Sequence, residues 1–263
     1  MLMKLLKYDL KWTYKNLIFF YVFSIIFAIL TRIFLGIENS TIFNVIGHIC
    51  SGTVVALIIN ILINSMIRVW VRFTKNIYSD ESYLTHTLPV KKETIYLSKF
   101  ILAIITMFTN ALVILLSLFI AYYSKEVLDI IKNYLDIIAI AYDTEIIKLI
   151  LTLSSIVFLE MLFIVLIGFT GIILGHKYNN GKKTKSILFS ILIYFMIQTI
   201  SLLIVFIFGL FNPDIMKLFT TNELINADIV KKVLTGAISL YTIYIIIIEI
   251  VNRKLFKQGI NVE

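Results

Sequence analysis

Four ionisable side chains stand in stretches that are otherwise apolar, and they are the residues whose chemistry must be explained: Arg32, His48, Glu160 and Glu249. Because burying a charge in lipid is costly, such residues are candidate functional groups. Arg32 and Glu249 lie near the ends of their stretches, where a long side chain can reach water, which favours a structural role. Glu160 lies near the middle of its stretch, so a place on a substrate path and a role in packing both stay open.

Metal and hydrolytic chemistry have little support in the residue pattern. His48 and Cys50 are two residues apart, so on a helix they point to different sides and make a poor metal pair. Cys50 is the single cysteine, which leaves no disulfide and no multi-thiolate site. The chain has no His-Glu-x-x-His segment and no convincing setting for a nucleophilic serine. We therefore expect neither a metal site nor an intramembrane hydrolase.

The segment Gly175–Thr184 has the glycines and lysines of a phosphate-binding loop but not their spacing. Five residues separate Gly175 from Gly181, where the motif needs four, and Lys183 stands as a second lysine before Thr184. No buried strand precedes the segment. We interpret it as a solvated basic loop and expect no ATPase activity, and no enzyme, in this chain.

The elements that must position these residues are membrane spans. The chain has 263 residues, of which 60% are hydrophobic and only 15% charged, a composition that nearly excludes a water-soluble enzyme. A span needs about 20 mainly apolar residues. The stretches long enough are Leu17–Gly36, Ile42–Ile67, Phe100–Tyr122, Leu149–Gly175, Ser186–Phe211 and Val233–Val251. The expected fold is an all-α polytopic membrane protein with six transmembrane helices, forming one domain over residues 1–263.

The net charge of +8 indicates how these spans are oriented. Most Lys and Arg residues fall in the amino-terminal tail, the second and fourth loops and the carboxy-terminal tail, whereas acidic residues gather in the third loop. The positive-inside rule then places both termini in the cytoplasm. The many Lys and Ile residues are typical of an AT-rich bacterial genome. We thus expect a multi-pass protein of the bacterial plasma membrane, without nucleic acid as a partner.

The amino-terminal residues 1–16 predict an amphipathic helix lying in the cytoplasmic interface, although a simple basic tail is an alternative. One arc of this helix carries Lys4, Lys7, Lys11 and Lys15, facing anionic headgroups. Trp12 lies on the opposite, apolar arc. Asp9 lies there too, which lipid contact does not explain, so we expect it to cap or pair with a neighbouring element.

The second loop, residues 68–99, predicts a short helix carried on the cytoplasmic ends of two spans. Ser79 is the expected N-cap, and Asp80 and Glu81 follow in the first turn, where the helix dipole favours negative charge. Pro89 should follow the end of this short helix and lie in the first turn of the next helix. A helix in this position can transmit force from a bound partner.

The external segments are residues 123–148 and 212–232. The first has apolar residues at helical spacing and predicts an amphipathic helix. The second mixes apolar residues with polar breaks and suits short half-helices that dip into the outer leaflet. Within the spans, small residues predict close helix packing: Gly47, Ser51, Gly168, Gly171 and Gly175.

Together, the basic amino-terminal helix, the six spans and the segment Tyr78–Lys99 resemble the permease subunit of a type-2 ABC exporter. The similarity is to small Gram-positive permeases that export peptides or antimicrobials, such as phenol-soluble modulins, or that give lantibiotic immunity. It implies a dimer with a second permease copy or paralogue, each subunit docked on a separate cytoplasmic ABC ATPase. ATP and Mg²⁺ would be held by that ATPase, with no cofactor in this chain. The cargo would be a peptide or a hydrophobic substrate.

The resemblance also implies roles for individual residues. The ATPase-coupling helix would consist of Ser79, Asp80, Glu81, Ser82, Tyr83 and Leu84, and residues 2–15 would form the connecting helix. By position alone, the candidate residues of the translocation path are Phe23, Phe27, Phe195 and Phe206, together with Glu160.

Two alternatives remain open beside the exporter. A secondary transporter or channel driven by an ion gradient would use Glu160 as a proton-linked group. A non-transporting immunity protein that sequesters a peptide would need neither an ATPase nor an ion gradient. An ATPase gene next to this one would favour the exporter.

Overall fold

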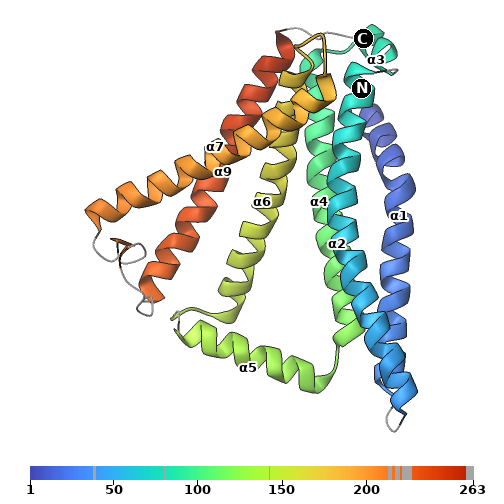
Figure 1. The fold of residues 1–263 in the computed structure, drawn as a ribbon, viewed down its shortest axis with the longest axis vertical. Helices are drawn as coiled ribbons and strands as arrows, with labels where there is room; N and C mark the ends of the chain where they lie inside the picture. The colour runs from blue at the N-terminus through green and yellow to red at the C-terminus, as the bar shows by residue number, and fades with distance from the viewer. Residues whose placement is uncertain are drawn as a thin grey trace. The chain divides into compact units, whose positions relative to one another are not determined.

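The structure is a computed structural model that describes residues 1–37, 40–79, 81–141, 143–212, 215–216, 220 and 227–258. Its regular elements in these ranges are helices (Figure 1): α1 (Leu2–Leu35), α2 (Thr41–Tyr78), α3 (Ser82–Thr87), α4 (Lys92–Tyr122), α5 (Lys125–Ala141), α6 (Ile146–Gly175), α7 (Lys182–Phe211) and α9 (Ala227–Lys257). All except α3 and α5 are long and apolar enough to cross a membrane. The expected all-α fold with six helices of this kind is confirmed.

The chain divides into two compact units, Met1–Ile131 and Lys132–Asn261. The first unit holds α1, α2, α3, α4 and the beginning of α5. The second holds the rest of α5 with α6, α7 and α9. That residues 1–263 form one domain stays a prediction.

In the first unit, α1, α2 and α4 lie side by side as a bundle (Figure 1). Its apolar core includes a cluster of Leu17, Tyr21 and Ile61. Further along the bundle, Ala28, Val54 and Ala121 form a second cluster. Burying apolar side chains against one another holds these helices where water is present, and close packing holds them where lipid surrounds the bundle.

A line of polar side chains runs through the interior of the same bundle. The Tyr21 hydroxyl donates to Asn110 Oδ1 at 2.6 Å, and Asn110 Nδ2 donates to Ser65 Oγ at 2.7 Å. Ser24 Oγ donates to Ser117 Oγ at 2.9 Å. Because these bonds join α1, α2 and α4 between buried groups, they fix the register of the three helices.

In the second unit, α6 packs against both α7 and α9. Two of the predicted glycine contacts are confirmed here: a Cβ on Gly171 would lie 2.6 Å from the Ser186 carbonyl oxygen, and one on Gly175 would lie 2.5 Å from Ser186 N. In the first unit, a Cβ on Gly47 would lie 2.7 Å from Leu35 Cδ2. At Gly171 and Gly175, only a residue without a side chain permits the backbones of α6 and α7 to approach so closely.

The prediction of a separate interfacial helix over residues 1–16 is wrong in its boundary, because α1 continues without a break from Leu2 to Leu35. No glycine or proline interrupts this stretch, so nothing in the backbone ends the helix. Its buried stripe also continues at helical spacing through Leu6, Asp9, Thr13 and Leu17. The lysines of the predicted arc, Lys4, Lys7, Lys11 and Lys15, are all exposed.

The two external segments differ in how far they are described. The amphipathic helix predicted within residues 123–148 is present as α5. Its apolar side chains include Ile130, Ile131 and Tyr134, which are exposed. The half-helices predicted within residues 212–232 lie mostly outside the described residues, and the end of that segment belongs to α9, which begins at Ala227.

Candidate functional site

A cluster of charged side chains is buried at the end of the first unit where α1 begins. Its centre is Asp9 of α1, which is only 1% exposed. Lys99 Nζ of α4 donates to Asp9 Oδ1 and Oδ2 at 2.6 and 2.7 Å, and Arg72 Nε of α2 donates to Oδ1 at 2.8 Å. Ser98 Oγ donates to Oδ2 at 2.8 Å. One carboxylate therefore ties together the three long helices of the unit.

Glu81, at the start of α3, supplies the second negative charge at the edge of this cluster, where its side chain is 40% exposed. Arg72 Nη1 donates to Glu81 Oε2 at 2.6 Å, and Asn76 Nδ2 donates to the same oxygen at 3.2 Å. Arg72 thus bridges two carboxylates, and the two acidic and two basic side chains balance. We call this set, Asp9, Arg72, Asn76, Glu81, Ser98 and Lys99, the Asp9 cluster. Because it is balanced and hydrogen-bonded, its burial is tolerated, whereas removing one partner would leave an uncompensated charge.

Trp12 covers the side of this cluster on α1. The guanidinium carbons of Arg72 and Arg68 lie 5.4 and 5.9 Å from the centroid of its ring, and Lys75 Nζ lies 5.9 Å away. Cations at this distance from an indole ring are attracted by its quadrupole. Trp12, which we expected on the apolar arc, therefore contacts the basic face of α2.

The short helix predicted after Tyr78 is present as α3, but its start is displaced. Ser79 is the C-cap of α2, and α3 begins only at Ser82 with Glu81 in the N-cap position. The predicted N-cap role of Ser79 is therefore wrong. The Glu81 side chain does not cap the helix because Arg72 and Asn76 hold it in the Asp9 cluster. Asp80 lies outside the described residues.

The end of α3 is close to the prediction. The helix stops at Thr87, two residues before Pro89. Pro89 does not enter α4 as predicted, because α4 begins at Lys92 with Lys91 as its N-cap. His86 Nε2 of α3 lies 3.1 Å from the carbonyl oxygen of Ile77, in the last turn of α2, and this contact holds α3 against that helix.

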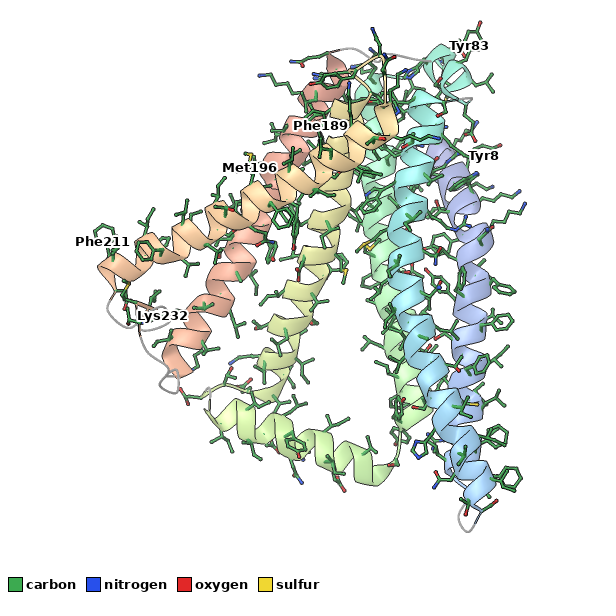
Figure 2. The ribbon with its side chains drawn as sticks, viewed as in Figure 1. Tyr8, Tyr83, Phe189, Met196, Phe211 and Lys232 are labelled. Atoms are coloured by element: carbon green, nitrogen blue, oxygen red, sulfur yellow. The ribbon has the colours of Figure 1, made fainter. Side chains whose placement is uncertain are left out.

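The two faces of α3 differ sharply in exposure. Ser82 and Thr85 are buried, at 2% and 4% exposed. Tyr83 and Leu84 are 75% and 69% exposed, and Figure 2 shows Tyr83 projecting away from the bundle. An aromatic and an aliphatic side chain, held outward on an anchored helix, form the kind of small apolar anchor that protein partners bind.

The candidate path residues lie in different units. In the first unit, Phe23 is exposed on α1 with its ring 4.3 Å from that of Phe19, and Phe27 packs on the Ala28 cluster. In the second unit, Phe195 and Phe206 are exposed on α7, at 64% and 39%. Their exposed faces suit contact with lipid or with a cargo, so their role in a path stays a prediction.

Glu160 lies at the middle of α6 and is partly buried. Its carboxylate is within electrostatic range of the Tyr241 hydroxyl on α9, and Gln198 of α7 hydrogen-bonds to the same tyrosine. The ring of Phe163, one turn along α6, has its centroid 5.5 Å from that of Tyr241 and 6.0 Å from that of Tyr244. Glu160 therefore lies one helical turn from Phe163, which packs in a group of aromatic side chains within the same unit.

The two other acidic and basic residues of the spans have local partners, in keeping with a structural role. Arg32 Nη1 donates to the Tyr123 carbonyl oxygen at 2.6 Å. Glu249 Oε1 accepts from Arg253 Nε at 2.7 Å, one helical turn away. In the part of the chain that the structure describes, no group of three or more His, Cys, Asp or Glu residues is arranged to hold a metal ion.

Sequence reasoning missed the Asp9 cluster as a site, although it noticed one member. Asp9 stood out as a carboxylate on an apolar arc. Arg72 and Lys99 gave no comparable signal, because each counts as an ordinary loop charge until the helices that carry them are packed together.

Comparison with protein-family models, with curated proteins and with solved structures finds no match to this chain.

Proposed function

We propose that this chain is the membrane-spanning permease subunit of an ATP-driven type-2 ABC exporter, acting as a dimer and coupled to separate ATPase subunits. The observation that carries the proposal is that α3 combines an exposed apolar face with firm attachment to the rest of its unit. Its exposed Tyr83 and Leu84 offer a docking surface, while Glu81 and His86 anchor the helix to the rest of the unit. A helix used to receive force must be both accessible and firmly held, and α3 meets both conditions.

The charge distribution supports a cytoplasmic position for this surface. In the proposed topology both termini and α3 lie in the cytoplasm of a bacterium, on the side where the basic loops gather. Basic side chains that the Asp9 cluster does not neutralise also lie on the adjoining part of α2: Lys75, which is exposed, and Arg68, which is partly buried. An ATPase that presents an acidic rim around an apolar groove would be complementary to them.

The Asp9 cluster supplies a route for the movement. Motion of the ATPase would displace α3, and Glu81 would pass the displacement to Arg72 of α2. Arg72 shares Asp9 with Lys99, so α1 and α4 would follow. The ATPase, with its ATP and Mg²⁺, would perform the hydrolysis, and this chain would provide only the path.

The uncovered apolar surface of α7 is compatible with an apolar or amphipathic cargo. In α7 only Ser186 and Gly209 are fully buried, and large apolar side chains such as Met196 and Phe211 are exposed along its length (Figure 2). Such a face suits a second permease copy, lipid, or an amphipathic cargo. An amphipathic peptide or a hydrophobic antimicrobial is the proposed substrate class.

Co-purification tests the docking role directly. The chain would be co-expressed with each candidate ABC ATPase of its source organism, and the ATPase recovered on an affinity tag carried by the permease would be measured. Tyr83→Ala combined with Leu84→Asp should reduce recovery at least about tenfold, because the anchor is removed while the Asp9 cluster is untouched. Tyr134→Ala, which changes a similarly exposed tyrosine of α5, is the matched control.

Full recovery of the ATPase with the Tyr83 and Leu84 variant would contradict the docking role of α3. Failure of any ABC ATPase to co-purify with the wild-type chain would contradict the exporter itself.

A second candidate function has one observation in its favour, the mid-helix carboxylate of Glu160. A transporter driven by a proton gradient would use such a group as a proton carrier. In that case Glu160→Gln should abolish the dependence of transport on external pH, measured in proteoliposomes without ATPase. Transport that requires the ATPase and keeps its pH dependence in Glu160→Gln would exclude this function.

A further inference from the structure

The Glu160 carboxylate has no cationic partner in the part of the chain that the structure describes. Three ion pairs of the second unit, between Lys148 and Glu145, Lys231 and Asp143, and Arg253 and Glu249, do not include Glu160. Glu160 sits at the midpoint of a helix of membrane-spanning length, so water does not readily replace the missing partner. A cation bound beside Glu160 would stabilise its ionised form at this position.

The surroundings of Glu160 are rich in tyrosine. Tyr241 of α9 lies within electrostatic range of the carboxylate. Phe163, three residues further along α6, contacts the rings of Tyr194 and Tyr241 at centroid distances of 6.5 and 5.5 Å. Tyr244 joins the same group at 6.0 Å from Phe163, and its hydroxyl lies 3.0 Å from Ser201 Oγ. The carboxylate and the tyrosines are therefore gathered from all three long helices of this unit.

These side chains share one chemical preference. Tyrosine rings attract cations through their electron-rich faces, and the attraction grows when water is excluded. A carboxylate adds a full negative charge and accepts hydrogen bonds from ammonium or guanidinium groups. The rest of the group is apolar, which suits the carbon stem that carries such a cation in a lysine or arginine side chain.

From this geometry we propose that Glu160, with Tyr194, Tyr241 and Tyr244, forms a binding site for a cationic group of an amphipathic ligand. The cation would supply the counter-charge that Glu160 lacks. The site's role in transport rests on the proposed exporter function and narrows its substrate class to cargo that carries an ammonium or guanidinium group. Binding of the cation itself requires no ATPase.

A pair of matched peptides tests the site. The probes are a dansyl-labelled amphipathic peptide of leucine and lysine, and the same peptide with every lysine acetylated. Both are titrated against the purified full-length chain in phosphatidylcholine nanodiscs, with empty nanodiscs as the blank for lipid partitioning. The lysine peptide should bind at least about tenfold more tightly than its acetylated form, as expected for a partly desolvated cation among aromatic rings and a carboxylate.

Variants assign this preference to the site. Glu160→Gln keeps the shape of the side chain and removes its charge, so it should weaken binding of the lysine peptide about tenfold and leave the acetylated peptide unchanged. Glu160→Asp keeps the charge and should retain part of the preference. Tyr241→Leu should weaken binding of the lysine peptide, whereas Tyr241→Phe should keep it within about twofold because the ring remains.

The matched control is Glu145→Gln at the beginning of α6, where the carboxylate is 72% exposed and pairs with Lys148. It should leave the binding of both peptides unchanged. Equal affinity of the wild-type chain for the two peptides would overturn the inference, as would an undiminished preference in Glu160→Gln. Either result would leave the exporter proposal standing, since that depends on the ATPase co-purifying.

Discussion

At the scale of single residues, the unusual feature of this chain is the charged Asp9 cluster, which is buried where α1, α2 and α4 meet. Asp9 is almost fully enclosed, and Lys99 is equally enclosed at 1% exposed. A buried ion pair adds little net stability, because the desolvation of both charges offsets their attraction. What the cluster does provide is a specific alignment of α1, α2 and α4, since only one register satisfies the hydrogen bonds to both Asp9 oxygens.

Removing one partner should therefore be far more harmful than removing the pair. Asp9→Asn leaves Arg72 and Lys99 with an unbalanced buried charge and should lower the free energy of unfolding by about 3–5 kcal/mol. Asp9→Asn combined with Lys99→Met should cost clearly less than the sum of the two single changes. The measurement is a double-mutant cycle from unfolding curves in detergent, and additive effects would show that the two side chains are not coupled.

At the scale of elements, packing distances separate glycines that are required from glycines that are not. In α6, Gly171 and Gly175 lie against the backbone of α7 at Ser186. In α9, a Cβ on Gly236 would meet nothing within 4 Å. The small-residue pattern in α6 was recognisable from the sequence, because the glycines recur at intervals that place them on one face of a helix.

Substitution at these glycines should therefore have opposite effects. Gly171→Val forces a branched side chain into the Ser186 backbone and should lower the midpoint of thermal unfolding in detergent by several degrees or prevent folding. Gly236→Val is the matched control of equal size in open space, and Gly236→Ala should raise stability by up to about 1 kcal/mol through helix propensity. Equal destabilisation by Gly171→Val and Gly236→Val would contradict the close α6–α7 contact.

At the scale of the whole molecule, the orientation in the membrane is open to direct measurement. The proposed topology puts Tyr83 in the cytoplasm and Tyr134 of α5 outside. Both side chains are well exposed, and the single natural cysteine, Cys50, is buried. In a Cys50→Ala background, Tyr134→Cys should react with a membrane-impermeant maleimide in intact cells, and Tyr83→Cys should react only after lysis. The reverse pattern would invert the topology and exclude docking of a cytoplasmic ATPase on α3.

The sequence by itself determined that the chain is helical and that six of its helices have the length and apolar character of membrane spans. Both follow from local composition, because each span needs only a long enough run of apolar residues. It also marked Asp9 and Glu160 as charges without an evident partner. The start of α3, by contrast, was misplaced, since capping rules describe Ser79 and Glu81 locally while a contact with Arg72 decides where Glu81 points.

Only the tertiary structure decided which distant residues meet. Asp9 is far along the chain from both Arg72 and Lys99, and the three become one cluster because α1, α2 and α4 pack in a single register. Likewise, Glu160 faces Tyr241 because α6 packs against α9. Helical periodicity tells which residues share a face, but the partner of that face depends on a balance of packing, charge and hydrogen bonding summed over the whole bundle. That balance is why the charged cluster and the tyrosine group around Phe163 could be recognised only in the folded chain.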